Sequence, residues 1–218
     1  AFVISAPPIL DRFGAAVEGG LRAGGFREVS LAPVPDGEGA KNLRTYEDLL
    51  LRLASFDDGA RMRVLVVCLG GGVVGDLGGF VAATYRRGVP FVQVPTTLLA
   101  MVDSAVGGKV AIDLKAKNQV GAFYQPSLVL ADTACLRTLP PAEIRSGLAE
   151  VVKYGVIADP AFFRFLEENR PAALRLDASV LRRIVVRSVE IKASGVGADE
   201  LDRTGRRAFL NFGHTIGH

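Results

Sequence analysis

Residues 64–88, VLVVCLGGGVVGDLGGFVAATYRRG, constrain the fold more than any other stretch of this chain. The first six, 64–69, are aliphatic or β-branched apart from Cys68, which is too short a run for a buried helix and is typical of a strand covered on both faces. A glycine-rich segment follows, and apolar periodicity at residues 80–85 indicates a helix. A buried strand that leads into a helix predicts a parallel sheet of the α/β type.

The glycine-rich segment is suited to binding a phosphate group. Gly70, Gly72 and Gly75 fit the pattern G-x-G-x-x-G, in which backbone N–H groups approach an anion at a helix N-terminus. An ordinary Rossmann site also needs an acidic residue about 20 positions later, and residues 89–95 contain none. Nucleotide binding therefore stays open in a less usual form, and so does the alternative that the glycines serve only tight packing.

The rest of the chain predicts two different architectures in succession. Strands are expected at residues 2–5, 29–31, 91–94 and 110–113, and helices at 10–21, 42–56 and 98–106. From residue 140 onward only helices are expected, at 141–157, 160–169 and 178–194. We therefore predict a Rossmann-like α/β domain with a mostly parallel sheet at residues 1–139. Residues 140–218 are predicted to form the start of an all-α domain, which is incomplete.

Composition excludes several classes of function. The formal net charge is +3, and no basic block is interleaved with aromatic residues, so no nucleic-acid partner is expected. No apolar run approaches the ~20 residues of a membrane span, and residues 1–5 do not resemble a signal peptide, which predicts a cytoplasmic protein without a membrane partner. Cys68 and Cys135 lack metal-ligand spacing and do not form a disulfide framework.

His214 and His218, the two histidines of the chain, are candidate metal ligands. On a helix they would project from one face, a turn apart. Thr215 occupies the position where a zincin has glutamate, which argues against a metalloprotease. Glu150 lies in a mostly apolar segment and could complete the site, although a simple ion pair with Lys153 explains it equally well. A purely structural histidine pair also remains open.

Five cations stand among small or apolar neighbours rather than among other charges, a pattern that favours convergence on an anionic ligand. They are Lys109, Lys117, Lys153, Lys192 and Arg207. Each taken alone is more often a solvated surface charge.

An ordered series of motifs gives the chain a close resemblance to a known family. GGGVVGDLGGFVAATYRRG, QVPTTLLAMVDSAVGGKVAID, KNQVGAF, SGLAEVVKYG and LNFGHTIGH follow one another and cover most of residues 64–218. In this order they resemble the 3-dehydroquinate synthases, a branch of the sugar-phosphate cyclases. The resemblance implies an NAD-binding domain over residues 1–139 and the start of a helical metal and substrate domain over 140–218.

The resemblance also implies a reaction, the conversion of 3-deoxy-arabino-heptulosonate 7-phosphate into 3-dehydroquinate and phosphate. NAD would oxidise the C5 hydroxyl held on zinc, which acidifies the C6–H and permits loss of phosphate, with the substrate's own phosphate helping as base. NADH would then return the hydride, and the ring would open and close again by an intramolecular aldol step. Cobalt or another divalent metal could replace zinc.

Site residues carried over by motif fall into three groups. For NAD they are Asp36, Glu38, Lys41, Gly71, Gly72, Val73, Val74, Gly75, Asp76, Thr96, Thr97, Lys109, Lys117, Cys135, Leu136, Arg137 and Thr138. For the metal they are Glu150 and His214. For the sugar-phosphate substrate and acid–base chemistry they are Asp103, Lys109, Asn118, Lys153, Lys192, Arg207, Asn211 and His218, with Arg87 reaching across the interface of a homodimer.

The match to the family has gaps. The family's third zinc ligand is a histidine in a later His-Gly-Glu motif that the chain does not contain, so we expect a fragment that binds zinc poorly and whose own turnover is doubtful. Ser5 and the residues after it replace an Asp-x-Asn nucleotide contact, and the segment around residues 202–203 is one residue longer than usual. Retention of Lys192, Arg207 and Asn211 favours the dehydroquinate branch over the inosose and valiolone cyclases.

Two alternatives stay open from the sequence. A zinc- and NAD-dependent polyol dehydrogenase of the glycerol dehydrogenase type would share the architecture but lack the lysine-rich substrate set, and it would release no phosphate. A non-catalytic nucleotide-binding module would bind NAD and take up no zinc.

Overall fold

The computed structural model describes residues 1–57, 59, 64–197, 199, 201–205 and 207–213. The chain forms two compact units, and each unit is discontinuous in sequence. Unit 1 comprises Ala1–Pro95 and Gly108–Leu130, and unit 2 comprises Thr96–Gly107 and the chain from Ala131 onward. The predicted domain division at residue 139 stays a prediction, since these units are defined by contacts and interleave along the chain.

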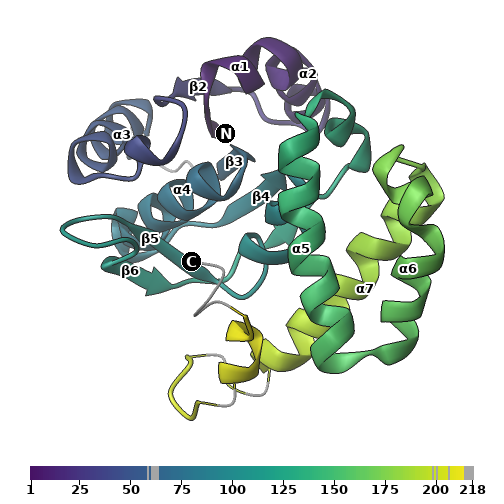
Figure 1. The fold of residues 1–218 in the computed structure, drawn as a ribbon. Coiled ribbons are helices and arrows are strands. Elements are labelled where there is room, and N and C mark those ends of the chain that lie inside the picture. The colour runs from purple at the N-terminus through teal and green to yellow at the C-terminus, as the bar shows by residue number, and fades with distance from the viewer. Residues whose placement is uncertain (58, 60–63, 198, 200, 206, 214–218) are drawn as a thin grey trace. The chain divides into compact units, whose positions relative to one another are not determined.

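Unit 1 is built on a five-stranded sheet in the order β2-β1-β3-β4-β7, in which every neighbouring pair is parallel (Figure 1). All residues of the central strand β3 are buried, as expected of a parallel strand covered on both faces. The five strands are β1 (Phe2–Ser5), β2 (Ser30–Pro33), β3 (Val66–Gly70), β4 (Phe91–Pro95) and β7 (Leu128–Val129).

Alternate residues of the strands of unit 1 enter two cores on opposite faces of the sheet. Phe2 and Ile4 of β1 pack with residues of α3 and α4, whereas Val3 packs on the face where Phe13 and Val17 lie. Helices thus cover both faces, which is the doubly wound arrangement that the β-α alternation predicted. The helical elements of unit 1 are α1 (Pro7–Ile9), the π-helical turn η1 (Leu10–Gly14), α2 (Ala15–Ala23), the 3-10 turn η2 (Glu38–Ala40), α3 (Leu43–Phe56), α4 (Gly72–Thr84) and the 3-10 turn η3 (Tyr85–Arg87).

Helix α4 begins earlier than predicted, at residue 72 rather than at residue 80. Several glycines assigned to a turn therefore lie inside the helix. A Cβ on Gly79 would stand 2.4 Å from Val110 Cγ1, so the missing side chain is what allows the helix to pack directly on its neighbours. The packing explanation, left open from the sequence, applies to these helical glycines, because burial against the strands outweighs the low helix propensity of glycine.

A two-stranded antiparallel sheet, β5 (Lys109–Ile112) and β6 (Val120–Phe123), packs against α4 in the same unit. Only β5 was predicted. β6 contains Gly121, whose absent side chain matters, because a Cβ there would meet the backbone oxygen of Val110 at 2.3 Å. The hairpin loop, residues 113–119, therefore projects from a closely packed base.

Among its described residues unit 2 contains helices and connecting turns but no strand, and its three long helices pack on one another (Figure 1). Leu98, Met101, Tyr154, Leu181 and Ile184 form the centre of its core. Its elements are the π-helical turn η4 (Ala100–Ser104), the 3-10 turn η5 (Thr133–Thr138), α5 (Pro141–Ala158), α6 (Pro160–Leu174), α7 (Ala178–Gly197) and the 3-10 turn η6 (Ala208–Asn211). The predicted fold class, a mostly parallel α/β part followed by an α-helical part, is confirmed.

Two predictions from the sequence concern membrane spans and disulfides. Among the residues that the structure covers, no helix has both the length and the apolar composition to cross a membrane. Cys68 and Cys135 are free thiols, the first buried and the second half-buried.

The packing of α4 gives a direct stability prediction. Gly79→Ala should lower the free energy of unfolding by about 1–3 kcal/mol, because the added methyl group must displace Val110 in a closed core. Gly20→Ala, in an open position of α2 with no atom within 4 Å of the added Cβ, should instead raise it by about 0.4–1 kcal/mol. Urea unfolding followed by circular dichroism measures both, and an equal gain for the two variants would contradict the packing argument.

Candidate active site

The first candidate feature is the turn between β3 and α4 in unit 1. β3 ends at Gly70, and Gly71 is the N-cap of α4, with no side chain to bond the N–H groups of the first helical turn. Those N–H groups and the positive end of the helix dipole suit a phosphate. The predicted cofactor residues 71–76 all lie in this turn and at the start of α4. Gly75 has a second reason to be glycine, since a Cβ there would lie 2.8 Å from Gln93 Oε1.

A buried ammonium group ties several predicted residues of unit 1 together. Lys41, whose side chain is 4% exposed, donates to Asp76 Oδ2 at 2.8 Å and to Asn118 Oδ1 at 2.5 Å. Its Nζ also lies 4.0 Å from Glu38 Oε1, and that carboxylate pairs with Lys117 at 3.4 Å. The structure thus brings five residues predicted from sequence into one cluster. Asp36, by contrast, is exposed and accepts the backbone N–H of the following residue, Gly37.

Arg87 stands in a strained turn after α4. Arg86 and Arg87 have φ of 49° and 64°, a left-handed conformation that costs a non-glycine residue about 1–2 kcal/mol. Asp57, nearly fully buried, compensates by accepting from Arg86 Nε at 3.0 Å and from the Tyr85 hydroxyl at 3.0 Å. The Arg87 side chain is exposed and makes no hydrogen bond or ion pair with the described residues. The turn therefore holds Arg87 outward.

Lys109, the other predicted substrate residue of unit 1, begins strand β5 and is exposed. Its Nζ lies 6.0 Å from the centre of the Phe123 ring on the partner strand β6. This is the distance of a weak cation–π contact.

In unit 2 the central acidic group is Asp103, which lies on the π-helical turn η4. The Ala105 N–H bonds to the Ala100 oxygen, five residues back, and such a widened turn is frequent at functional sites. Lys192 Nζ donates to Asp103 Oδ1 at 2.6 Å and to its backbone oxygen at 2.5 Å. The Tyr154 hydroxyl donates to the same Oδ1 at 3.0 Å. Both donors use Oδ1, which leaves Oδ2 as an acceptor.

A second ion pair joins two residues that lie one turn apart on α5. Lys153 Nζ contacts Glu150 Oε1 and donates to the backbone oxygen of Leu210 at 2.5 Å. Both side chains are about one-tenth exposed. The ion-pair explanation for Glu150 that the sequence left open is therefore confirmed as a contact, and it does not exclude a metal role.

The remaining predicted residues of unit 2 differ in their accessibility. Arg207 is buried, and a Cβ on Gly107 would lie 3.0 Å from its guanidinium and 3.8 Å from Lys192 Cε, so the two cations lie close together. Asn211, at the end of η6, is exposed. Thr96 is buried, and its Oγ1 has no hydrogen-bond partner among the described residues, which fits a hydroxyl that a ligand would satisfy.

The segment 135–138, predicted beside NAD, forms the 3-10 turn η5. Asp132 caps it by accepting from the Ala134 N–H, and Thr138 Oγ1 donates to the Cys135 oxygen. Leu136 is fully buried in the core of unit 2, so its side chain serves packing. Burial, followed by the charge of Asp132, raises the pKa of the Cys135 thiol.

The electrostatics of unit 2 show that its charged groups act on one another. Burial by itself would raise the pKa of Asp103, but the charge and hydrogen bond of Lys192, helped by Lys153, outweigh it and hold that pKa below its usual value. Burial lowers the pKa of Lys192, against the opposing charge of Asp103. Burial and then the charges of Asp103 and Glu150 raise the pKa of Tyr154, which therefore stays a neutral donor.

The structure describes only one of the two residues predicted to bind the metal. Glu150 is described and offers a largely buried carboxylate, a donor suited to a divalent cation. His214 and His218 lie outside the described residues. Within the part of the chain that is described, no three His, Cys, Asp or Glu residues cluster closely enough to hold a metal ion. Glu150 is therefore a suitable ligand for a metal ion. A complete metal site would also need ligands from outside the described residues.

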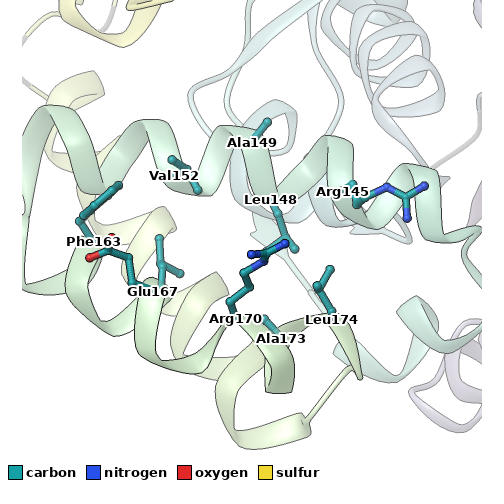
Figure 2. A pocket seen from close by; sticks show the side chains of 10 residues that line it. Arg145, Leu148, Ala149, Val152, Phe163, Glu167, Arg170, Ala173 and Leu174 are labelled. Atoms are coloured by element: carbon teal, nitrogen blue, oxygen red, sulfur yellow. The ribbon is translucent and has the colours of Figure 1, made fainter.

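A groove of about 380 Å³ between α5 and α6 is separate from these predicted residues (Figure 2). Its lining is mainly apolar, including Leu148, Val152 and Leu166, with Arg145 and Arg170 at its margin. None of the predicted site residues lines it, and an apolar lining does not suit a sugar phosphate.

Sequence reasoning missed two residues that support the site. Tyr154 is fully buried and was read as part of an apolar helix, but its hydroxyl bonds Asp103. Asp57 directly follows the predicted helix 42–56 and was given no role, yet it holds the turn that presents Arg87. Their spacing carries no signal, because both roles depend on partners about 30 to 50 residues away in sequence.

Replacing Lys192 should show how strongly it controls Asp103. In Lys192→Met the pKa of Asp103 should rise, because burial then acts without the opposing cation. In the unchanged protein the lowered pKa means that the ionised carboxylate adds stability above its unfolded pKa and loses it as pH falls through the folded value. A carbon-13 NMR titration of the Asp103 carboxyl group measures the shift.

Arg182→Met is the matched control, since Arg182 is an exposed cation on the same helix. An Asp103 pKa that is equal in both variants and the parent protein would show that Lys192 is not the controlling charge.

Comparison with known proteins gives this geometry a family. Residues 31–146 match the family described as 3-dehydroquinate synthase N-terminal, and residues 147–218 match 3-dehydroquinate synthase C-terminal. The 3-dehydroquinate synthase of Desulforamulus reducens is 53% identical over 199 residues, which is 91% of this chain and 54% of that protein. The chain spans between 54% and 59% of the length of three such curated relatives.

Solved structures agree on the fold. The 2-epi-5-epi-valiolone synthase from Streptomyces hygroscopicus, with NAD+ and Zn2+ bound, has a TM-score of 0.89 at 28% identity and covers 98% of this chain and 59% of its own. A 2-deoxy-scyllo-inosose synthase complexed with carbaglucose-6-phosphate, NAD+ and Co2+ has a TM-score of 0.87 at 30% identity, over 100% of this chain and 58% of its own. Sequence and structure together show that this chain belongs to the 3-dehydroquinate synthase family.

Proposed function

We propose that the protein converts 3-deoxy-arabino-heptulosonate 7-phosphate into 3-dehydroquinate and inorganic phosphate. The observation that carries the proposal is the cluster of charged side chains in the described part of unit 2. Lys153 and Lys192, each less than one-tenth exposed, pair with the carboxylates of Glu150 and Asp103. Arg207 and Asp199 are buried in the same unit. Fixed ammonium groups beside a carboxylate that keeps one acceptor oxygen suit a ligand with both anionic oxygens and hydroxyl groups.

The chain's own residues can bind and orient this substrate. Lys153 and Lys192 present fixed ammonium groups to its anionic oxygens, as charge-assisted donors. Asp103, ionised and held through Oδ1, can accept a hydrogen bond from a substrate hydroxyl at Oδ2. In the overall reaction a C–H proton and a phosphate group leave the sugar, and the substrate's own phosphate is the proposed acceptor for that proton.

For NAD, the residues of unit 1 that would hold it are the Gly71–Asp76 turn, with the uncapped first turn of α4 suited to the pyrophosphate. When bound, NAD supplies a hydride acceptor that returns the hydride later, so the reaction has no net redox change. Two related structures contain NAD+, which supports this assignment.

For the metal we propose zinc, held by Glu150 and His214 with a further ligand. When bound, it would polarise a substrate hydroxyl as a Lewis acid. The related structures contain Zn2+ in one case and Co2+ in the other, so a divalent cation has broader support than zinc itself.

The dehydroquinate reaction is favoured over the other cyclase reactions by degree of similarity. The curated relatives that share more than half of their aligned residues with this chain are named 3-dehydroquinate synthase, whereas the valiolone and inosose synthases share less than a third. Lys192, Arg207 and Asn211, whose retention in the motif resemblance favours the dehydroquinate branch, are all present.

We also propose a cytoplasmic homodimer. Arg87 supports the dimer, because a strained turn holds its side chain outward without a partner among the described residues. The two free thiols fit a reducing compartment.

Phosphate release tests the proposed function. The full-length protein with its third metal ligand, incubated with NAD, a zinc salt and the heptulosonate phosphate, should release inorganic phosphate, and Lys153→Met in that protein should reduce the rate by about 10²–10³-fold, because a fixed cation is lost from the site. Arg182→Met should keep the parent rate, since that side chain is exposed and lies outside the proposed site. NAD binding without phosphate release would contradict the cyclase and favour a nucleotide-binding module.

A further inference from the structure

Tyr154, on helix α5, is fully buried in the core of unit 2, and its hydroxyl meets two acceptors there. The hydroxyl lies 3.0 Å from Asp103 Oδ1 and 3.2 Å from the backbone oxygen of Val102. Both acceptors belong to the π-helical turn η4, which lies in unit 2 together with α5. A buried phenol hydroxyl usually finds a partner, and here the partner is a carboxylate 51 residues earlier in the chain.

The hydroxyl proton of Tyr154 is directed to the carboxylate of Asp103. A tyrosine hydroxyl has one hydrogen to donate. Burial, followed by the charges of Asp103 and Glu150, raises the pKa of Tyr154, so the hydroxyl keeps this hydrogen. The carboxylate oxygen is nearer than the Val102 oxygen and is charged, and charge-assisted hydrogen bonds are about twice as strong as neutral ones. Tyr154 is therefore a neutral donor to Asp103 Oδ1.

A rigid donor matters for Asp103 because a carboxylate can rotate. The torsion that turns an aspartate carboxylate is broad, without a single sharply preferred angle. Lys192 also donates to Oδ1, at 2.6 Å, but its ammonium group stands on a flexible four-carbon side chain, so on its own it restrains the rotation less. The ring of Tyr154 has only two side-chain torsions and is fully buried. Its hydroxyl therefore selects one oxygen of Asp103 and fixes the plane of the carboxylate.

The carboxylate of Asp103 is itself accessible to a ligand. Its side chain is 37% exposed, whereas that of Lys192 is 10% exposed and Tyr154 is 0% exposed. Among the described residues, both donors to this side chain use Oδ1, so Oδ2 keeps its capacity as an acceptor. A hydroxyl of a ligand can therefore meet an acceptor oxygen that is already oriented.

We propose that Tyr154 is a positioning residue of the cyclase, whose hydroxyl fixes the rotation of the Asp103 carboxylate so that Oδ2 accepts a hydrogen bond from a hydroxyl of the sugar-phosphate substrate. The inference rests on the proposed function, in which Asp103 contacts the substrate. Tyr154 itself makes no contact with the substrate, and it acts through Asp103.

The first test is a double-mutant cycle on binding of the heptulosonate phosphate to the full-length, zinc-loaded protein. Calorimetry without NAD measures this binding, so that no turnover is needed. Tyr154→Phe keeps the ring and removes only the hydroxyl, and it should weaken binding by about tenfold. Asp103→Ala should weaken binding by at least as much. The double variant should bind within about twofold of Asp103→Ala, because Tyr154 acts only through Asp103, and additive losses would overturn the proposal.

A second test uses sulfate as the ligand and needs only the Tyr154→Phe variant. Sulfate offers anionic oxygens to the cations of the site and has no hydrogen to donate to Asp103. Tyr154→Phe should therefore leave the affinity for sulfate within about twofold of the parent value, while the affinity for the heptulosonate phosphate falls. An equal loss for both ligands would mean that the hydroxyl only supports the packing of the site, which would overturn the proposal.

Tyr46→Phe is the matched control, since it removes a tyrosine hydroxyl that bonds Thr84 Oγ1 in unit 1. It should change neither affinity. In the phosphate assay Tyr154→Phe should lower kcat/KM by about tenfold, and Tyr46→Phe should keep the parent value. Binding of the heptulosonate phosphate by the parent protein without phosphate release would contradict the cyclase and leave the positioning role of Tyr154 standing, whereas an absence of binding would overturn both.

Discussion

The close packing of helix α4 on the strands of unit 1 is the constraint on which the rest of that unit depends. Gly75, Gly78 and Gly79 let the helix backbone approach Gln93, Cys68 and Val110 at distances that a Cβ would not allow. That approach places the N-terminus of α4 at the carboxyl end of β3 and brings Asp76 to Lys41. It also seats strand β5, from which the Asn118 loop projects. The glycines therefore contribute to the candidate site, because they determine how closely β3, Lys41 and β5 lie to α4.

Unit 2 rests on a different principle, in which charged side chains of opposite sign are held close together. Asp103 is held by Lys192 and Tyr154, and Glu150 by Lys153. Isolated buried ions are costly, so each must find partners, and these pairs come from separate helices and the π-helical turn. The same arrangement that satisfies the fold leaves Asp103 Oδ2 as an acceptor. In the proposed function, stability and substrate recognition would use the same side chains.

Much of the fold could be predicted because local patterns determined it. The apolar run at residues 64–69 and the periodicities of residues 141–157 and 178–194 gave a strand and two helices close to those observed. Predictions failed where tertiary packing outweighed propensity, as in the early start of α4 and in strand β6, whose Gly121 is unfavourable for a strand but required by the backbone of Val110. Tyr154 and Asp57 were missed because their partners are distant in sequence.

The sequence by itself determined the family, the order of the α/β and helical parts, and the residue types available for an anionic ligand, since ordered motifs and periodicity are written in consecutive residues. Only the tertiary structure decided which of those residues meet. It showed that Lys41 reaches Asn118, that Lys192 and Tyr154 share one oxygen of Asp103, and that Arg87 stands in a strained turn. Hydrogen bonds and ion pairs act over a few ångströms, whereas their partners here are separated by dozens of residues, so only the folded chain can select them.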